Sequence, residues 1–185
     1  EHFPGAWTDV GTPQRLREVL KHMRAGTSVG ADAWGVKELR KLPEAWLQRL
    51  CDLLDVVETC GRWPSPVTQG LVAPIPKEEG SRADATRPIT VMSCIYRLWA
   101  ATRVGELLIW QEAWSSHHVS SYKAGQGCED AWWAQALELE HSLLAGGPLA
   151  GANFDFVKAF DRLPNEILLQ LAERVGMSAN IINGL

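Results

Sequence analysis

The chain has 185 residues, the usual size of one compact domain and too few for two full-sized ones. Hydrophobic residues make up 46% and charged residues 22%, a composition that excludes a disordered tail and predicts a folded core. The formal net charge of −4 does not by itself indicate a nucleic-acid-binding protein, and no stretch approaches the roughly 20 apolar residues that a membrane span needs.

The distribution of charges, the cysteines and the N-terminus add three constraints. Residues 71–104 contain five basic and three acidic residues, whereas residues 105–154 contain one basic and six acidic residues. The N-terminal residues have neither an initiator Met nor the pattern of a signal peptide, so the chain reads as an excised segment. The cysteines have no CxxC pair and no regular spacing, so we expect buried free thiols in an intracellular, reducing compartment rather than a zinc site or disulfides. They are Cys51, Cys60, Cys94 and Cys128.

The first third of the chain predicts two amphipathic helices. Residues 12–24 begin with Thr-Pro, which is typical of a capped helix, and carry apolar residues at helical spacing. A Gly-rich loop is expected over residues 25–35. Residues 43–60 predict a second helix with leucines in register, which Gly61 ends.

The middle of the chain predicts a β-hairpin followed by a helix. Residues 67–76 and 88–93 read as two short strands, and the polar segment 77–87 between them reads as their turn. Residues 94–113 are apolar on nearly all sides, which predicts a buried helix.

The remaining elements complete an α+β pattern. After a loop at residues 115–127 we expect an amphipathic helix over 129–145, a strand entering a turn over 149–160, and a helix over 164–176. Helices, a hairpin, helices, a strand and a helix follow one another in that order. This order favours an α+β fold over a regular βαβ alternation.

Asp155 is the most informative single residue. It alternates with Phe154 and Phe156 in the predicted strand, where an ionised carboxylate is costly without a cationic partner. A divalent cation such as magnesium is one solution. A hydrogen bond to a turn at the end of an edge strand is the other, and the residues alone leave both open.

The segment F-D-F-V-K-A-F-D-R-L-P, residues 154–164, resembles the first catalytic motif of reverse transcriptases, especially those of non-LTR retrotransposons. Four further blocks resemble the family in the same order: an opening segment, two fingers strands, the helix after them, and the block before the catalytic strand. They lie at residues 29–43, 71–77 with 86–91, 95–104 and 121–131.

The resemblance covers about residues 26–175. It implies a truncated right-hand polymerase, with a helix-rich fingers region containing a β-hairpin and the first part of the palm. We therefore expect an N-terminal extension over residues 1–25 and a partial reverse transcriptase domain over residues 26–185.

The implied activity is RNA-directed DNA synthesis, in which dNTPs are added to a primer 3′-hydroxyl along an RNA template by two-metal nucleotidyl transfer. Asp155 would be the catalytic residue and would bind two Mg²⁺ ions. Lys77 and Arg87, which the predicted hairpin brings together, would hold the triphosphate, or they belong to a solvated hairpin tip. Phe156 and Phe160 would contact the nucleotide; the Phe160 ring would exclude a 2′-hydroxyl, or it is a core residue.

The chain lacks the second carboxylate motif that the complete reaction needs. Two metal ions about 3.5–4 Å apart need at least two carboxylates, and the sequence contains no Asp-Asp pair. We therefore expect the 185-residue chain alone to be inactive. A group II intron or retron-like reverse transcriptase and a degenerate, non-catalytic RNA-binding remnant are the alternatives, and no membrane partner is expected.

Overall fold

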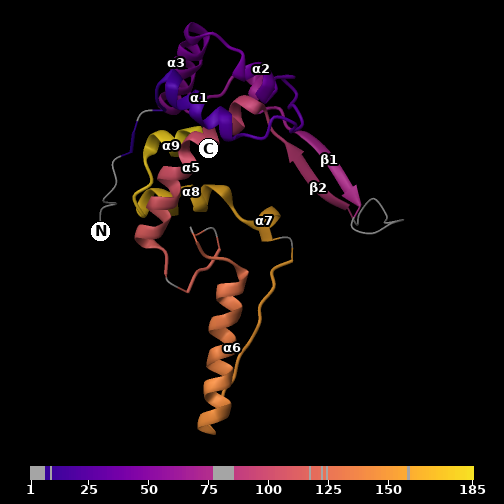
Figure 1. Cartoon of the computed structure of the whole chain (residues 1–185), viewed down its shortest axis with the longest axis vertical. Helices are drawn as coiled ribbons and strands as arrows, with labels where there is room; N and C mark the ends of the chain where they lie inside the picture. Colours follow the sequence, from indigo (N-terminus) through magenta and orange to yellow (C-terminus); the bar gives the residue numbers. More distant parts are fainter. Residues whose placement is uncertain are drawn as a thin grey trace. The chain divides into compact units, whose positions relative to one another are not determined.

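The computed structural model describes residues 7–8, 10–76, 86–116, 118–121, 123, 125–157 and 159–185, with the backbone only for Phe160 and Asp161. These residues form nine helices and one two-stranded antiparallel sheet (Figure 1). The predicted helix-rich α+β class is confirmed at this level. Within the described residues, no helix is both long and apolar enough to cross a bilayer.

The chain divides into two compact units, which are described separately. The core unit consists of Ala6–Gly105 and Ser178–Leu185, and the α6 unit contains Glu106–Met177. The expected division into an N-terminal extension (residues 1–25) and a partial reverse transcriptase domain (residues 26–185) stays a prediction.

The core unit contains five helices, the first twelve residues of a sixth, and the hairpin. Their bounds are α1 Pro13–His22, α2 Val36–Arg40, α3 Glu44–Cys60, α4 Ser65–Thr68, β1 Leu71–Pro76, β2 Thr86–Val91, α5 Cys94–Trp114 and α9 Ala179–Gly184. The helix shared between the two units is α5, which continues past Gly105.

Local sequence explains the ends of α1 and α3. The Thr12 hydroxyl accepts a hydrogen bond from the backbone N–H of Arg15 at 3.3 Å, and Pro13 occupies the first helical position. Gly61 ends α3 with a φ of 66°, the left-handed conformation that glycine adopts without a steric penalty. Both predicted helices are confirmed.

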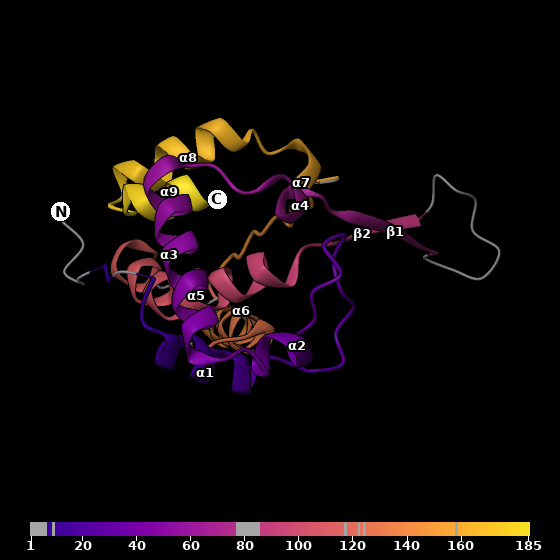
Figure 2. The same ribbon diagram turned by 90° about the horizontal axis from the view of Figure 1, so that it is seen from above.

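The predicted β-hairpin is also confirmed, with shifted bounds. β1 pairs antiparallel with β2 from Leu71↔Val91 to Pro76↔Thr86, and the hairpin extends away from the helices of its unit in both views (Figures 1 and 2). The prediction that the first strand begins at residue 67 is wrong because α4, with proline in its first turn, occupies Ser65–Thr68. β2 ends before Ser93, whose hydroxyl accepts a hydrogen bond from the N–H of Ile95 at the start of α5.

The hydrophobic core lies between α1, α2, α3 and the start of α5. The apolar residues at helical spacing in α1 and α3 meet those of α2 and α5 there, and Figure 2 shows α9 beside α3. The buried residues of this cluster are Val10, Leu16, Leu20, Val36, Leu39, Leu47, Leu50, Cys51, Leu54, Cys94, Leu98 and Trp99.

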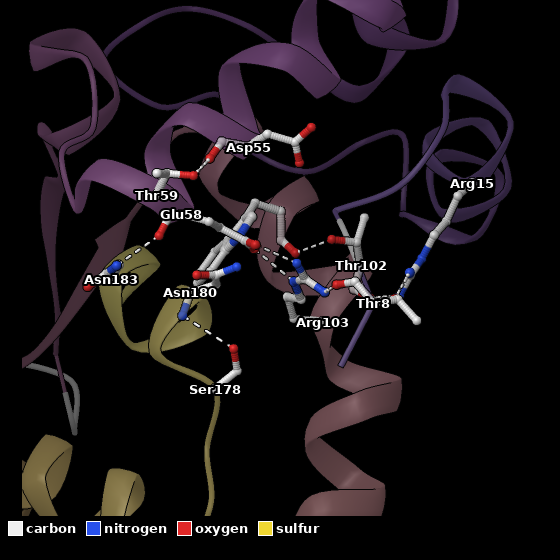
Figure 3. Close-up of polar contacts among 11 residues, drawn as sticks. Thr8, Arg15, Asp55, Glu58, Thr59, Thr102, Arg103, Ser178, Asn180 and Asn183 are labelled. Atoms are coloured by element: carbon white, nitrogen blue, oxygen red, sulfur yellow. Dashed lines mark hydrogen bonds and ion pairs between the residues drawn. The ribbon is translucent and has the colours of Figure 1, made fainter. Parts of the chain in front are cut away.

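A buried ion pair connects four segments of the core unit (Figure 3). Glu58 of α3 accepts hydrogen bonds from Nε of Arg103 at 2.8 Å and from Nε1 of Trp99 at 2.7 Å. Nη1 of Arg103 donates to the carbonyl of Thr8 at 2.7 Å, and Nδ2 of Asn183 in α9 donates to the carbonyl of Glu58 at 2.9 Å. Because the charged groups are 2–3% exposed and satisfy one another, the pair links α3, α5, α9 and the segment before α1.

The α6 unit contains the end of α5 together with α6 (Cys128–Ala145), α7 (Ala159–Arg162) and α8 (Asn165–Arg174). The predicted helices 129–145 and 164–176 are confirmed as α6 and α8, although neither has a buried residue. Trp110 is buried, and its Nε1 donates to the carbonyl of Val175 at 2.9 Å.

Three expectations require correction. The strand predicted within residues 149–160 does not form: residues 151–156 have no regular structure, because within the described chain β1 and β2 pair only with each other. The helix at 94–113 is not buried on all sides, since Ile109 is 62% exposed. Cys51 and Cys94 are buried free thiols, as expected, but Cys60 and Cys128 are exposed.

Candidate functional site

Asp155 lies in an exposed segment of the α6 unit. Its neighbours Phe154 and Phe156 are 84% and 77% exposed, and Asp155 itself is exposed. Within the described part of the chain its side chain has no hydrogen bond or ion pair. Because the expected apolar strand does not form and the carboxylate is in water, Asp155 has no desolvation cost for a cationic partner to offset, and its binding of magnesium stays a prediction.

The described residues do not form a complete metal centre around Asp155. No group of three or more His, Cys, Asp or Glu side chains is placed to hold an ion among them. One carboxylate cannot hold two magnesium ions, so the residues present do not fit a two-metal site by themselves. The chain can contribute a single ligand through Asp155.

The structure describes the side chain of Phe156 but only the backbone of Phe160. Phe156 follows Asp155 directly, and its exposed ring is not fixed by a surrounding core. The backbone of Phe160 lies in α7, and its side chain is outside the described residues. Its role beneath a sugar therefore stays a prediction.

Arg87 lies on β2, opposite Ile75 of β1. It is exposed and has no ion pair within the described residues. Lys77 lies outside the described residues; in sequence it follows Pro76, the last paired residue of β1, whose partner Thr86 precedes Arg87. Arg87 belongs to the core unit and Asp155 to the α6 unit, so the shared site expected for them stays a prediction.

An open pocket at the base of the hairpin was not predicted. It lies within the core unit, between the loop after α1, the end of β2 and the first turn of α5, and Arg24 and Arg97 contribute to its lining. In the sequence, only the excess of basic over acidic residues in residues 71–104, which include Arg97, pointed to a positively charged site in this region. Arg24 gave no comparable signal, since it lies 73 positions away and only folding brings it near.

Comparison with known proteins does not assign the chain to a family. No protein-family model matches the sequence, and no curated protein matches it. The likeness to reverse transcriptases therefore rests on the motifs in this sequence.

Proposed function

We propose that this chain is the fingers and the beginning of the palm of an RNA-directed DNA polymerase of the non-LTR retrotransposon type. Its partners would be an RNA template, a primer strand and dNTPs, with magnesium in the complete enzyme. The observation that carries the proposal is the antiparallel hairpin between the long helices α3 and α5, in the order that the resemblance implies, with Arg87 exposed on β2.

Arg87 supports triphosphate binding through its surroundings. The guanidinium is planar and presents several N–H donors in a fork that matches phosphate oxygens. No acidic side chain of the described residues neutralises it, so its charge is available to an anionic ligand. Lys77, next to the last hairpin pair in sequence, would add a second positive charge.

Asp155 supports the catalytic part of the proposal only as one of several required groups. Its exposed carboxylate is accessible to a cation, and magnesium prefers such oxygen ligands. Because the chain has no Asp-Asp pair to complete a two-metal site, we propose that the 185-residue chain alone does not extend a primer.

Primer extension on poly(rA)/oligo(dT) tests the proposal. The protein used is the longest polypeptide that the gene encodes, provided that it contains an x-x-Asp-Asp segment, which supplies the remaining metal-binding carboxylates of reverse transcriptases. We expect Asp155→Asn to abolish extension, whereas Glu140→Gln, an exposed carboxylate on α6, should leave it unchanged. Arg87→Gln should raise the KM for dTTP about 10-fold to 100-fold, from the loss of a charge-assisted hydrogen bond of about 1.5–3 kcal/mol. An active Asp155→Asn variant would refute the assignment.

The non-catalytic RNA-binding remnant is the second candidate. It is favoured by the lack of a carboxylate cluster around Asp155 among the described residues. If the polypeptide binds RNA but no version that carries an x-x-Asp-Asp segment extends a primer, the remnant is the better description.

A further inference from the structure

The pocket at the base of the hairpin, which we call the base pocket, combines three segments of the core unit. It is open to solvent and has a volume of about 480 Å³. Its polar lining comes from the loop after α1, from the end of β2 and from the first turn of α5. The polar lining residues are Arg24, Thr27, Ser28, Thr90, Tyr96 and Arg97.

The base pocket is positively charged. Arg24 and Arg97 line it, and none of its lining residues is acidic. The nearby carboxylate of Asp32 accepts a hydrogen bond from the Ser93 hydroxyl at 2.6 Å and forms no ion pair with Arg97. The two positive charges are therefore not neutralised by the described protein.

Arg97 has an unused donor. One Nη donates to the carbonyl of Ser28 at 2.6 Å, which holds the guanidinium against the loop. Its Nε is buried and has no hydrogen-bond partner within the described residues. A buried donor without an acceptor costs about 1–3 kcal/mol, so an oxyanion that accepts this hydrogen bond is stabilised.

The base pocket also has an apolar lining. Val91, Met92 and the Tyr96 ring contribute to it. The Tyr96 ring packs against Trp63 and Trp99 with ring centroids 5.4 and 5.5 Å apart, so its position is set by the core. A tyrosine hydroxyl is uncharged at neutral pH, and burial raises the pKa of Tyr96 further above its ordinary value, so it adds no negative charge to the pocket. Apolar surface next to paired cations suits a phosphate that carries an organic group better than a bare ion.

We infer that the base pocket binds the phosphate group of a nucleotide, carried either on a polynucleotide strand or on a free nucleotide, with Arg24 and Arg97 as its ligands. The site lies wholly in the core unit and does not involve Asp155 or Arg87. The choice of a nucleotide rests on the proposed function, whose partners are RNA and dNTPs, and the inference deepens that function by assigning a phosphate contact outside the candidate catalytic site.

Fluorescence anisotropy tests the inference with fluorescein-labelled U10 RNA, in EDTA and at low salt. We expect Arg24→Gln and Arg97→Lys each to weaken binding about 3-fold to 10-fold, since Lys keeps the charge but has no Nε–H at that position. Arg24→Gln should also reduce the slope of log K against log salt concentration by up to about 0.7, whereas Arg97→Lys, which keeps the positive charge, should leave the slope unchanged. Arg49→Gln, which removes an exposed arginine of α3 outside the pocket, should bind as the parent does.

Competition distinguishes the two sources of the phosphate. Unlabelled dATP, U10 RNA and inorganic phosphate are added to the complex with labelled RNA. Stronger competition per mole by U10 identifies a strand, and equal or stronger competition by dATP identifies a free nucleotide. Inorganic phosphate that competes as well as both would refute the nucleotide assignment.

An NMR readout separates binding from loss of folding. The Nε–H resonance of Arg97, assigned by its disappearance in Arg97→Lys, should shift on addition of U10 or dATP. An unshifted resonance at saturation, or parental affinity in both pocket variants, overturns the inference. Asp155→Asn should bind U10 with the same affinity as the parent protein. This result would show that binding at the base pocket does not depend on the proposed catalytic residue.

Discussion

The core unit and the α6 unit contain apolar helices of similar length but bury them differently. In α3 the apolar side of the helix is covered, and Leu47 and Leu54 are fully buried. In α6 no residue is buried, and Trp132 and Leu144 are 63% and 83% exposed. Apolar residues at helical spacing therefore predicted both helices, but burial depended on whether another element packs against the helix.

The core unit also buries an ion pair, whereas the buried charged residue of the α6 unit among the described residues is Lys123, which donates to the carbonyl of Ser116 at 2.8 Å. Glu58 accepts hydrogen bonds from Arg103 and from Trp99, and Arg103 also donates to the carbonyl of Thr8. This arrangement predicts that substitutions in the core unit will change stability much more than substitutions in α6.

Breaking the buried ion pair should have the largest effect. Glu58→Gln leaves the Arg103 guanidinium buried without its counter-charge, so we expect a loss of about 3–5 kcal/mol in the free energy of unfolding. Urea denaturation followed by tryptophan fluorescence measures it. The exposed pair Arg49–Asp52 is the control, and Arg49→Gln should cost less than about 1 kcal/mol. Equal losses of unfolding free energy in both variants would contradict the predicted difference between the buried and the exposed ion pair.

A leucine from each unit gives the most direct comparison. Leu54→Ala opens a cavity at a fully buried position and should cost about 2–5 kcal/mol, whereas Leu144→Ala on α6 should stay within about 0.5 kcal/mol. The same urea titration applies to both. A large loss in Leu144→Ala would show that α6 is covered in solution.

A glycine substitution tests the close approach of α9 to α5. A Cβ at Gly184 would overlap the Trp99 ring, and Gly184 also accepts a hydrogen bond from Nε1 of Trp63. We expect Gly184→Ala to cost about 1–3 kcal/mol through overpacking. Gly105→Ala, where a Cβ meets no atom within 4 Å, should be neutral or stabilising by up to about 1 kcal/mol in thermal unfolding.

Thiol reactivity should give the smallest effect. Burial raises the pKa of Cys51 to about 11, with further contributions from Asp55 and Asp52, and burial also raises the pKa of Cys94. At pH 8 we expect iodoacetamide to label the exposed Cys60 and Cys128 well before these two. Because the folded state keeps the Cys51 thiol protonated, stability should fall as the pH rises from about 9 towards 11. Fast labelling of Cys51 in the native protein would contradict its burial.

Local patterns predicted the elements that depend on neighbouring residues. The Thr12–Pro13 start of α1, the Gly61 end of α3 and the β1–β2 hairpin were all recognisable, because caps and hairpins form from residues close in sequence. The strand predicted around Asp155 does not form, because a strand needs a partner strand and alternating apolar residues in one segment do not show whether a partner is present.

The candidate site shows the same division. The sequence identified Asp155 and Arg87 through the motifs around them, but it placed Asp155 in an apolar strand, whereas the carboxylate is exposed. The base pocket was missed because Arg24 and Arg97 lie far apart in sequence and meet only through the fold.

The amino-acid sequence by itself determined the helix-rich α+β character, the hairpin and the helix ends, because capping, turn geometry and apolar spacing act over a few residues. Only the tertiary structure decided which apolar faces are covered, that Glu58 and Arg103 form a buried pair, and that Arg97 keeps a buried donor unused. Burial and charge pairing depend on contacts between distant segments, which spacing along the chain does not encode.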